Sequence, residues 1–186
     1  QAFEKFDVKV SFAKNSRDLK NADQLILPGV GAFSSAMFKL ESLDLVEPIK
    51  RFASSGKNIL GICLGMQILF DKSFEFGEHE GLSLIEGNVE KIMYQEGYKI
   101  PNISWSSLNI NSKDHNLFNN INENDAFYFV HSFTAKPKNV EKNLATCKFG
   151  DQNLCAIAGY ENVIGTQFHP EKSGKKGLSL IRNWLN

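Results

Sequence analysis

One cysteine in this chain lies in a pattern that suits a nucleophile. Cys63 is at the centre of Gly61-Ile62-Cys63-Leu64-Gly65, the cysteine version of the G-x-S-x-G pattern found where a strand turns sharply into a helix. Such a turn has room only for glycine two residues before and two residues after the nucleophile. The thiol then lies at a helix N-terminus, which favours the thiolate, and the N–H of Leu64 points to where an oxyanion would form. The same five residues also suit a buried structural cysteine between two packing glycines.

A base for this nucleophile, and a group to orient the base, occur much later in the chain. The triplet His169-Pro170-Glu171 follows an apolar run, Val163–Phe168, that is typical of a strand. A cysteine nucleophile needs a base, and the base needs a partner that fixes its orientation. His169 suits the first role and Glu171 the second, with Pro170 stiffening the link between them. Taken alone, most such triplets are a strand-end histidine followed by a turn proline and a solvated glutamate.

A glycine-rich loop supplies a further candidate. Pro28-Gly29-Val30-Gly31 ends a compact apolar run, and its two glycines allow unusual backbone dihedral angles. Such a loop can present the N–H of Gly31 as a second donor to an oxyanion. A phosphate-binding loop is not indicated, because neither G-x-G-x-x-G nor a following Lys-Ser/Thr is present.

A metal site is a weaker hypothesis. Cys147, Cys155, His131 and His169 are the residues that could be offered as ligands. No pair of them has the spacing of a zinc site. The sequence therefore predicts neither a metal nor a cofactor.

The elements that must position these residues can be outlined from apolar periodicity. Four segments alternate strand and helix and predict a parallel sheet covered by helices: strands at Gln24–Leu27 and Asn58–Ile62, helices at Ala32–Leu40 and Leu45–Ser55. A helix is expected to start at Cys63 and run to Phe70. From Ile85 onward most segments are strand-like, and a helix is expected over Gly177–Leu185. A short strand is also expected at Val8–Phe12, and a polar loop at Asp71–Gly81.

Composition limits the class of protein. The chain has 186 residues, 42% of them hydrophobic, and its 21 Lys and Arg balance its 21 Asp and Glu. No basic excess points to nucleic acid, and the apolar runs are far shorter than a membrane span. Three cysteines without a CxxC pair argue against a disulfide framework and for a reducing, cytoplasmic location.

The three motifs, in this order, resemble those of the class I (triad) glutamine amidotransferases. The family pattern P-G-x-G, G-x-C-x-G-x-Q and H-P-E corresponds to Pro28–Gly31, Gly61–Gln67 and His169–Glu171, and the match covers nearly the whole chain. The resemblance implies an α/β fold in which a central, mostly parallel sheet is flanked by helices and joined to a smaller antiparallel part. It also implies a Cys-His-Glu triad that hydrolyses glutamine to glutamate and ammonia without a cofactor.

Within that family, the chain looks like the glutaminase subunits of imidazole glycerol phosphate synthase, an enzyme of histidine biosynthesis. The similarity implies a heterodimer in which ammonia passes from this chain to a synthase (cyclase) subunit. It places Trp105 and Lys172 toward the partner. It implies that the glutamine pocket is lined by Gln67, His131, Ser132 and Phe133.

Two features depart from the pattern of those subunits. Their N-terminal strand and its Gly-Asn-Leu loop are absent before Gln1, so we expect one amidotransferase domain over residues 1–186 without its native first strand. Their interface segment, roughly Pro-His-Met-Gly-Trp-Asn, here reads Pro-Asn-Ile-Ser-Trp-Ser over residues 101–106, which keeps only Pro101 and Trp105. The second departure leaves open a subunit that supplies ammonia to a different synthase, such as one that amidates a bacterial surface sugar.

Two other classes of protein remain to be distinguished. One is a free-standing cysteine hydrolase, such as a peptidase or a γ-glutamyl hydrolase, but Gln67 and the stretch Val130–Phe133 favour glutamine as substrate. The other is a non-catalytic interaction subunit that has kept the fold, which an intact triad argues against. A peptidase would cleave peptides without a partner, whereas a glutaminase subunit is expected to depend on one.

Overall fold

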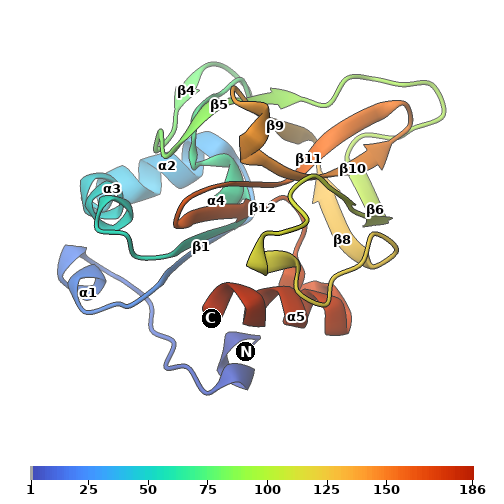
Figure 1. Ribbon diagram of the computed structural model, residues 1–186. Helices are drawn as coiled ribbons and strands as arrows, with labels where there is room; N and C mark the ends of the chain where they lie inside the picture. The colour runs from blue at the N-terminus through green and yellow to red at the C-terminus, as the bar shows by residue number, and fades with distance from the viewer. Residues whose placement is uncertain (1) are drawn as a thin grey trace.

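The computed structural model describes residues 2–186 (Figure 1), in which helices and strands are interspersed up to residue 67 and strands predominate after it. The strands are β1 (Leu25–Gly29), β2 (Ile59–Cys63), β3 (Phe70–Ser73), β4 (His79–Glu80), β5 (Ile85–Lys91), β6 (Asn102–Ser107), β7 (Asn109–Ile110), β8 (Ala126–His131), β9 (Phe133–Pro137), β10 (Asn143–Phe149), β11 (Gln152–Tyr160) and β12 (Val163–Thr166). The α-helices are α1 (Ser16–Lys20), α2 (Phe33–Ser42), α3 (Val46–Ser54), α4 (Leu64–Gln67) and α5 (Gly174–Leu185). Single 3-10 turns lie at η1 (Phe3–Phe6), η2 (Asn116–Phe118), η3 (Val140–Lys142) and η4 (Pro170–Lys172).

The largest sheet combines a parallel half with an antiparallel half. Its strand order is β1-β2-β12-β11-β10-β7. Strands β1, β2 and β12 are parallel, whereas β11, β10 and β7 each pair antiparallel with the strand before them in that order. The predicted α/β fold, a parallel sheet covered by helices and continued by an antiparallel part, is confirmed. Because β2 and β12 are parallel neighbours, the residues that follow them emerge at the same edge of the sheet.

Both faces of β2 and β12 are buried, which explains their continuous apolar sequences. Successive residues of β2 point to opposite faces: Ile59 belongs to one apolar cluster and Leu60 to the other. The first cluster includes Phe33 of α2 and Ile49 of α3, and the second includes Trp184 of α5. Figure 1 accordingly shows α2 and α3 on one side of the sheet and α5 on the other.

Two smaller sheets complete the described part of the chain. One has the order β4-β3-β5-β9, and the other consists of β6 and β8. Strand β8 contacts the segment that follows β12, where the N–H of His169 donates to the carbonyl of Tyr128 at 3.0 Å. These sheets therefore bring strands from the middle of the chain to the carboxyl edge of β2 and β12.

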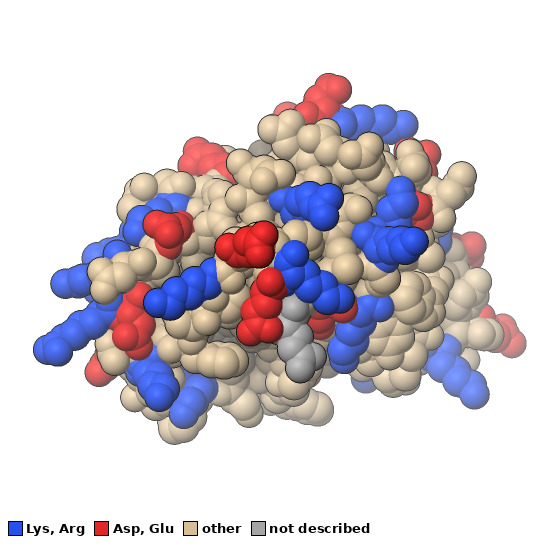
Figure 2. Space-filling model, turned by 90° about the horizontal axis from the view of Figure 1, so that it is seen from below, with Lys and Arg blue, Asp and Glu red and all other residues tan. Residues whose placement is uncertain are grey.

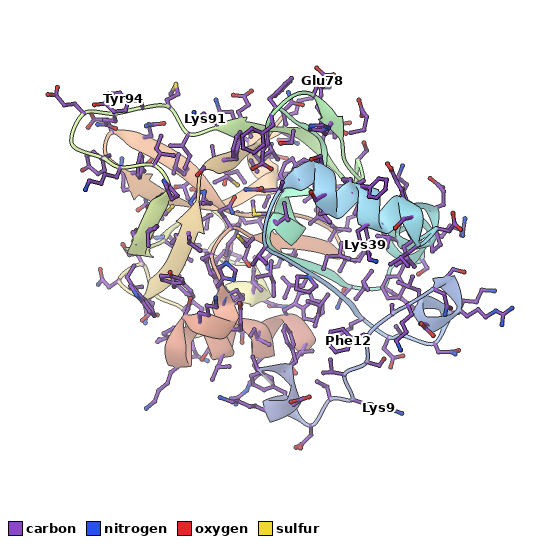
Figure 3. The ribbon with its side chains drawn as sticks, turned by 180° about the vertical axis from the view of Figure 1, so that it is seen from behind. Lys9, Phe12, Lys39, Glu78, Lys91 and Tyr94 are labelled. Carbon is purple, nitrogen blue, oxygen red and sulfur yellow. The ribbon has the colours of Figure 1, made fainter. Side chains whose placement is uncertain are left out.

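The predicted strand at Val8–Phe12 is wrong. These residues form no strand and pair with none of the described strands. Val10 is 45% exposed and Phe12 89% exposed, and Figure 3 shows Lys9 and Phe12 on a segment that runs outside the sheets. Alternating apolar residues become a strand only when a neighbouring strand accepts their hydrogen bonds.

The predicted loop at Asp71–Gly81 is also wrong in part. Strand β3 covers its first residues, and β4 covers His79–Glu80. The segment is polar because β4 is the edge strand of its sheet, where charged side chains are usual. Lys72 pairs with Glu78 at 2.9 Å across this hairpin.

Charges of both signs are interspersed on the surface. Figure 2 shows Lys and Arg side chains lying among Asp and Glu side chains over one face. Exposed ion pairs, such as that of Lys136 with Glu90 at 2.7 Å, contribute only about 0–1 kcal/mol each. Among the described residues, no helix has the length and apolar character needed to span a membrane.

Candidate active site

The chain turns sharply at Cys63, between β2 and α4. The backbone of Cys63 has φ 56° and ψ −110°, which is a strained conformation for a residue with a side chain. Such strain persists only where the surrounding structure imposes it, and it is common at active sites. The strand-to-helix turn predicted around Cys63 is therefore present. The helix is shorter than predicted, since α4 ends at Gln67 and the chain enters β3 three residues later.

Close packing of α4 against the sheet explains the two glycines of the motif. A Cβ at Gly65 would overlap the carbonyl of Leu27, and a Cβ at Gly61 would lie 2.5 Å from the carbonyl oxygen of Gly65. Gly165 of β12 is opposite Gly61 in the register, and a Cβ there would lie 2.5 Å from Cγ of Met66. Strands β1, β2 and β12 thus pack so closely against α4 that no Cβ fits between them at these glycines. The predicted crowding at Gly61 and Gly65 is confirmed.

Strand β12 brings His169 to the same edge as Cys63. Thr166 pairs with Ile62 in the parallel register, so β2 and β12 end side by side at the same edge of the sheet. Hydrogen bonds fix the backbone beyond that point. Ser173 Oγ donates to the carbonyl of His169 at 2.6 Å and accepts the N–H of Tyr128 at 3.0 Å.

The turn η4 places Glu171 against the imidazole ring of His169. Nδ1 of His169 lies 2.8 Å from Oε1 of Glu171. A carboxylate can only accept at this site, so Nδ1 carries the proton and Nε2 is left for Cys63. His169 is 4% exposed. The structure therefore brings Cys63, His169 and Glu171 together in the order that a nucleophile, a base and an orienting group require.

The electrostatics of the site favour a charged imidazole ring. The hydrogen bond with Cys63, followed by that with Glu171, raises the pKa of His169 to about 9, against the opposing effect of burial. Burial acts to raise the pKa of Glu171, but the hydrogen bond from His169 and the nearby positive charges outweigh it, and the pKa of Glu171 is lowered. Each ionised form therefore stabilises its neighbour.

A cavity of about 320 Å³ opens at this edge of the sheet. Its volume lies in the usual range for a small-molecule site. Its walls come from the loop after β1, from the Cys63 turn, from the segment after β3, and from the ends of β8 and β12. The lining residues are Val30, Gly31, Cys63, Leu64, Gln67, Glu75, Pro101, Val130, His131, Ser132, Phe133 and His169.

The structure gathers the residues predicted to bind the oxyanion and the substrate around this cavity. Gly31, with φ 101°, has the unusual dihedral angle expected of its loop, and it lines the wall together with Leu64. Gln67, Ser132 and Phe133 also line it. What the structure adds is their arrangement, since these residues come from the loop after β1, the nucleophile turn and the β8–β9 connection.

His131 lines the cavity as an uncharged ring. Its Nδ1 donates to the carbonyl of Phe133 at 2.7 Å, and its Nε2 accepts from Asn102 Nδ2 at 3.1 Å. Burial lowers the pKa of His131 to about 4. Both ring nitrogens are occupied by these bonds, so the ring fixes the wall rather than transferring protons.

Trp105 and Lys172 lie on the surface beside the cavity. Trp105 is 58% exposed, and its ring is 5.7 Å from that of Tyr128, which is in turn 6.5 Å from that of His169. Lys172 is exposed and follows Glu171 in η4. Both residues are therefore close to the triad without lining the cavity.

Two residues of the site were not predicted from the sequence. Glu75 lines the cavity, and its Oε2 accepts the N–H of Phe33, the first residue of α2, at 2.6 Å. It lies in the segment expected to be a loop, so no pattern distinguished it. Gln167 is fully buried, and its amide lies 3.8 Å from Sγ of Cys63. The available signal was an amide side chain in the mostly apolar run Val163–Phe168 before His169.

The other two cysteines differ from Cys63. Cys147 and Cys155 are buried on adjacent strands β10 and β11, away from the cavity. Burial raises the pKa of Cys147 to about 12 and raises that of Cys155 further, so both remain protonated and unreactive. Within residues 2–186, no three His, Cys, Asp or Glu side chains are placed to hold a metal ion.

Comparison with known proteins agrees with this geometry. The family model described as glutamine amidotransferase class-I matches residues 1–186. A Legionella pneumophila (strain Lens) protein named imidazole glycerol phosphate synthase subunit HisH 1 is 46% identical over 193 residues, covering 100% of this chain and 91% of that protein. A subunit HisH from Aquifex aeolicus is 44% identical, covering 95% of this chain and 83% of the relative.

A solved structure shares the fold at much lower sequence similarity. A crystal structure titled glutamine amidotransferase superposes with a TM-score of 0.72 at 18% identity, covering 99% of this chain and 88% of that one. At that identity the likeness concerns the fold alone. Together with the family model, which spans the whole chain, and the relatives above 40% identity, it shows that the chain belongs to the class I glutamine amidotransferases.

Proposed function

We propose that this chain is the glutaminase subunit of an imidazole glycerol phosphate synthase in histidine biosynthesis. It hydrolyses glutamine to glutamate and ammonia and delivers the ammonia to a cyclase subunit in a heterodimer. The observation that carries the proposal is that Cys63 and His169 line one cavity, with Oε1 of Glu171 2.8 Å from Nδ1 of His169. The names of the relatives support the choice of pathway.

In acylation, the thiol proton of Cys63 first passes to His169. Sγ of Cys63 attacks the side-chain amide carbon of glutamine, and a tetrahedral oxyanion forms. His169, whose pKa of about 9 keeps it protonated at neutral pH, gives its proton to the amide nitrogen. The C–N bond breaks, ammonia leaves, and a γ-glutamyl thioester remains on Cys63.

Backbone N–H groups stabilise the oxyanion. The N–H of Leu64 follows the nucleophile directly, and Gly31, in the loop after β1, lines the cavity and offers a second N–H. Removing one such donor typically costs about 100- to 1000-fold in rate. We therefore expect the conformation of the loop at Gly31 to affect the rate of acylation.

Deacylation reverses the roles of the same groups. His169, now neutral, removes a proton from water, and the resulting hydroxide attacks the thioester carbon. The thiolate of Cys63 leaves, and glutamate is released. Glu171 holds the imidazole ring in one tautomer through both steps, with its Oε1 2.8 Å from Nδ1.

The charges of the cavity fit the amino-acid part of glutamine. Glu75 is the acidic residue in the lining, and its carboxylate suits the α-ammonium group. Ser132 offers a hydroxyl group and backbone groups to the α-carboxylate. The amide nitrogen of Gln67 is already bonded to Phe133 and Gln167, so Gln67 acts on the substrate through its oxygen or through its position in the wall.

The surface around the cavity suits a partner. Trp105 and Ile103 of β6 are 58% and 63% exposed, and exposed aromatic residues are enriched at interfaces. A partner over this surface would take up ammonia before water protonates it. Three free cysteines fit a reducing cytoplasm.

The test is glutamate release from glutamine by the full-length chain with an imidazole glycerol phosphate cyclase subunit and its nucleotide substrate. We expect slow release by the chain alone, strong stimulation by the cyclase, and loss of about 1000-fold or more in Cys63→Ala. Cys147→Ala is the matched control, because its thiol is buried away from the cavity, and it should keep the wild-type rate.

Other results would assign another function. If the cyclase has no effect while a glutamine analogue still labels Cys63, the glutaminase stands and the synthase belongs to another pathway, such as surface-sugar amidation. Strong partner-free hydrolysis of peptides would indicate a free-standing hydrolase. An unlabelled Cys63 in folded protein would indicate a non-catalytic subunit.

A further inference from the structure

A second side chain besides that of His169 reaches the nucleophile. Gln167 lies between β12 and His169, is fully buried, and has its Nε2 3.8 Å from Sγ of Cys63. We propose that Gln167 is a positioning residue, whose amide donates a hydrogen bond to the sulfur and holds the thiolate in place for attack on glutamine. This inference rests on the proposed function, since it concerns the same nucleophile.

Neighbouring groups determine which end of the Gln167 amide faces the sulfur. The carbonyl of Phe133 can only accept, so the group of Gln67 that lies 3.2 Å from it is the NH₂. The same NH₂ lies 3.0 Å from Gln167 and must donate to its oxygen. The NH₂ of Gln167 is thereby turned toward Cys63.

The buried ring of His131 fixes the carbonyl of Phe133, at which this chain of hydrogen bonds begins. Nδ1 of His131 donates to the same carbonyl of Phe133 at 2.7 Å. The carbonyl therefore accepts two donors, from His131 and Gln67, and its position does not depend on one bond. An amide buried without partners would be costly, but both ends of Gln167 are occupied.

The donor matters most when the sulfur is charged. A thiol can donate to the carbonyl of Val130, 3.9 Å from Sγ, but a thiolate can only accept. His169 gives its proton away during acylation, whereas the amide of Gln167 does not titrate. The amide therefore remains a donor when the thiolate leaves the thioester during deacylation. Hydrogen bonds to charged groups are stronger than those between neutral ones.

The other titratable groups around the sulfur are few. Those that line the cavity with Cys63 are His169 after β12, His131 at the end of β8, and Glu75 after β3. All three are unchanged in a Gln167 variant. A change in the pH profile of Cys63 reactivity would therefore report the amide itself.

The experiment compares alkylation of Cys63 by iodoacetamide in the wild-type chain and in Gln167→Met, which has similar volume and no donor. The rate is followed across mildly acidic to mildly alkaline pH by mass spectrometry of the Cys63 peptide. We expect alkylation about tenfold slower at neutral pH and a profile moved to higher pH. With the partner present, kcat should fall while KM stays within about twofold.

Thr166→Val is the matched control, because Thr166 is fully buried at the end of β12, next to Gln167, and its Oγ1 donates to the carbonyl of Phe168 rather than to Cys63. It should lower the melting temperature and leave the alkylation profile unchanged. Gln167→Glu, which puts a carboxylate beside the sulfur, should react more slowly than Gln167→Met.

The proposal is overturned if Gln167→Met has the wild-type profile, or if Thr166→Val moves the profile as much. Should Gln167→Met not fold, Gln67→Met removes the donor that orients Gln167 and should shift the profile less, in the same direction; no shift would also overturn it. Absence of glutamate release by the wild-type protein would count against the proposed function and leave the alkylation comparison intact.

Discussion

At the residue scale, two histidines of the site respond to protons in opposite ways. His169 gains a carboxylate and a sulfur as partners, and its pKa rises from 6.5 to about 9. His131 loses contact with water, and its pKa falls from 6.5 to about 4. The folded chain therefore binds the proton of His169 more tightly than the unfolded chain does, and binds that of His131 less tightly.

The stability of the folded chain should have a corresponding pH dependence. The contribution of His169 is complete below pH 6.5 and is lost as the pH rises through about 9, whereas that of His131 is lost as the pH falls from 6.5 toward 4. Between neutral and alkaline pH, the free energy of unfolding measured in urea should fall in both proteins. The fall should be about 1–3 kcal/mol smaller in His169→Gln than in the wild type. Equal slopes for the two proteins on the alkaline side would contradict the charged ring.

Sequence patterns identify the reacting residues more readily than they identify the residues that position them. Cys63, His169 and Glu171 belong to short motifs whose spacing follows from the chemistry. Glu75 and Gln167 do not, because each acts through contacts made by the folded chain, such as the 3.8 Å approach of Gln167 to Cys63. No local pattern records a contact of that kind.

At the element scale, the packing of α4 on β1, β2 and β12 determines where the nucleophile lies. The strands β1, β2 and β12 could be predicted from compact apolar runs, because strands buried on both faces have such runs. Strands β3 and β4 could not, because an edge hairpin with an ion pair between Lys72 and Glu78 has the composition of a loop. At Val8–Phe12 the error is the opposite one: a strand is predicted where there is none, because periodicity cannot show whether a neighbouring strand is present.

Gly65→Ala tests the packing of α4. Its Cβ would overlap the backbone carbonyl of Leu27, which cannot move without disturbing β1. We expect a loss of about 3 kcal/mol or more in the free energy of unfolding, measured in urea. Gly56→Ala is the control: its φ is 80° but no atom lies within 4 Å, so only the backbone term of about 1–2 kcal/mol applies. Equal losses would show that α4 does not need this close approach.

At the scale of the whole molecule, the cavity and the exposed side of β6 lie together. Trp105 packs against Tyr128 with its ring centre 5.7 Å away, and this pair connects the surface to His169. The family and the fold class could be predicted from the motif order. The motif order does not determine the partner, because residues 101–106 keep only Pro101 and Trp105 of the interface segment found in imidazole glycerol phosphate synthase subunits.

Trp105→Ala tests this surface. Because Trp105 is 58% exposed, its loss should change the free energy of unfolding by less than about 1 kcal/mol. Under the proposed function this exposed aromatic residue contacts the cyclase, so its loss should weaken binding to the cyclase about tenfold or more in calorimetric titration. Tyr94→Ala, at an 80% exposed residue on the loop after β5 (Figure 3), is the control and should bind normally. Unchanged affinity in Trp105→Ala would place the partner elsewhere.

The parallel register of β2 and β12 has one more consequence. Ile62 faces Thr166, so the spacing of nucleophile and base is fixed by the pairing of two adjacent strands, whatever the length of chain between them. That intervening chain supplies β6, with Trp105, and β8, with Tyr128. Mutation can therefore remodel the proposed docking surface while the spacing of Cys63 and His169 is preserved, so that the reaction and the choice of partner can be inherited separately.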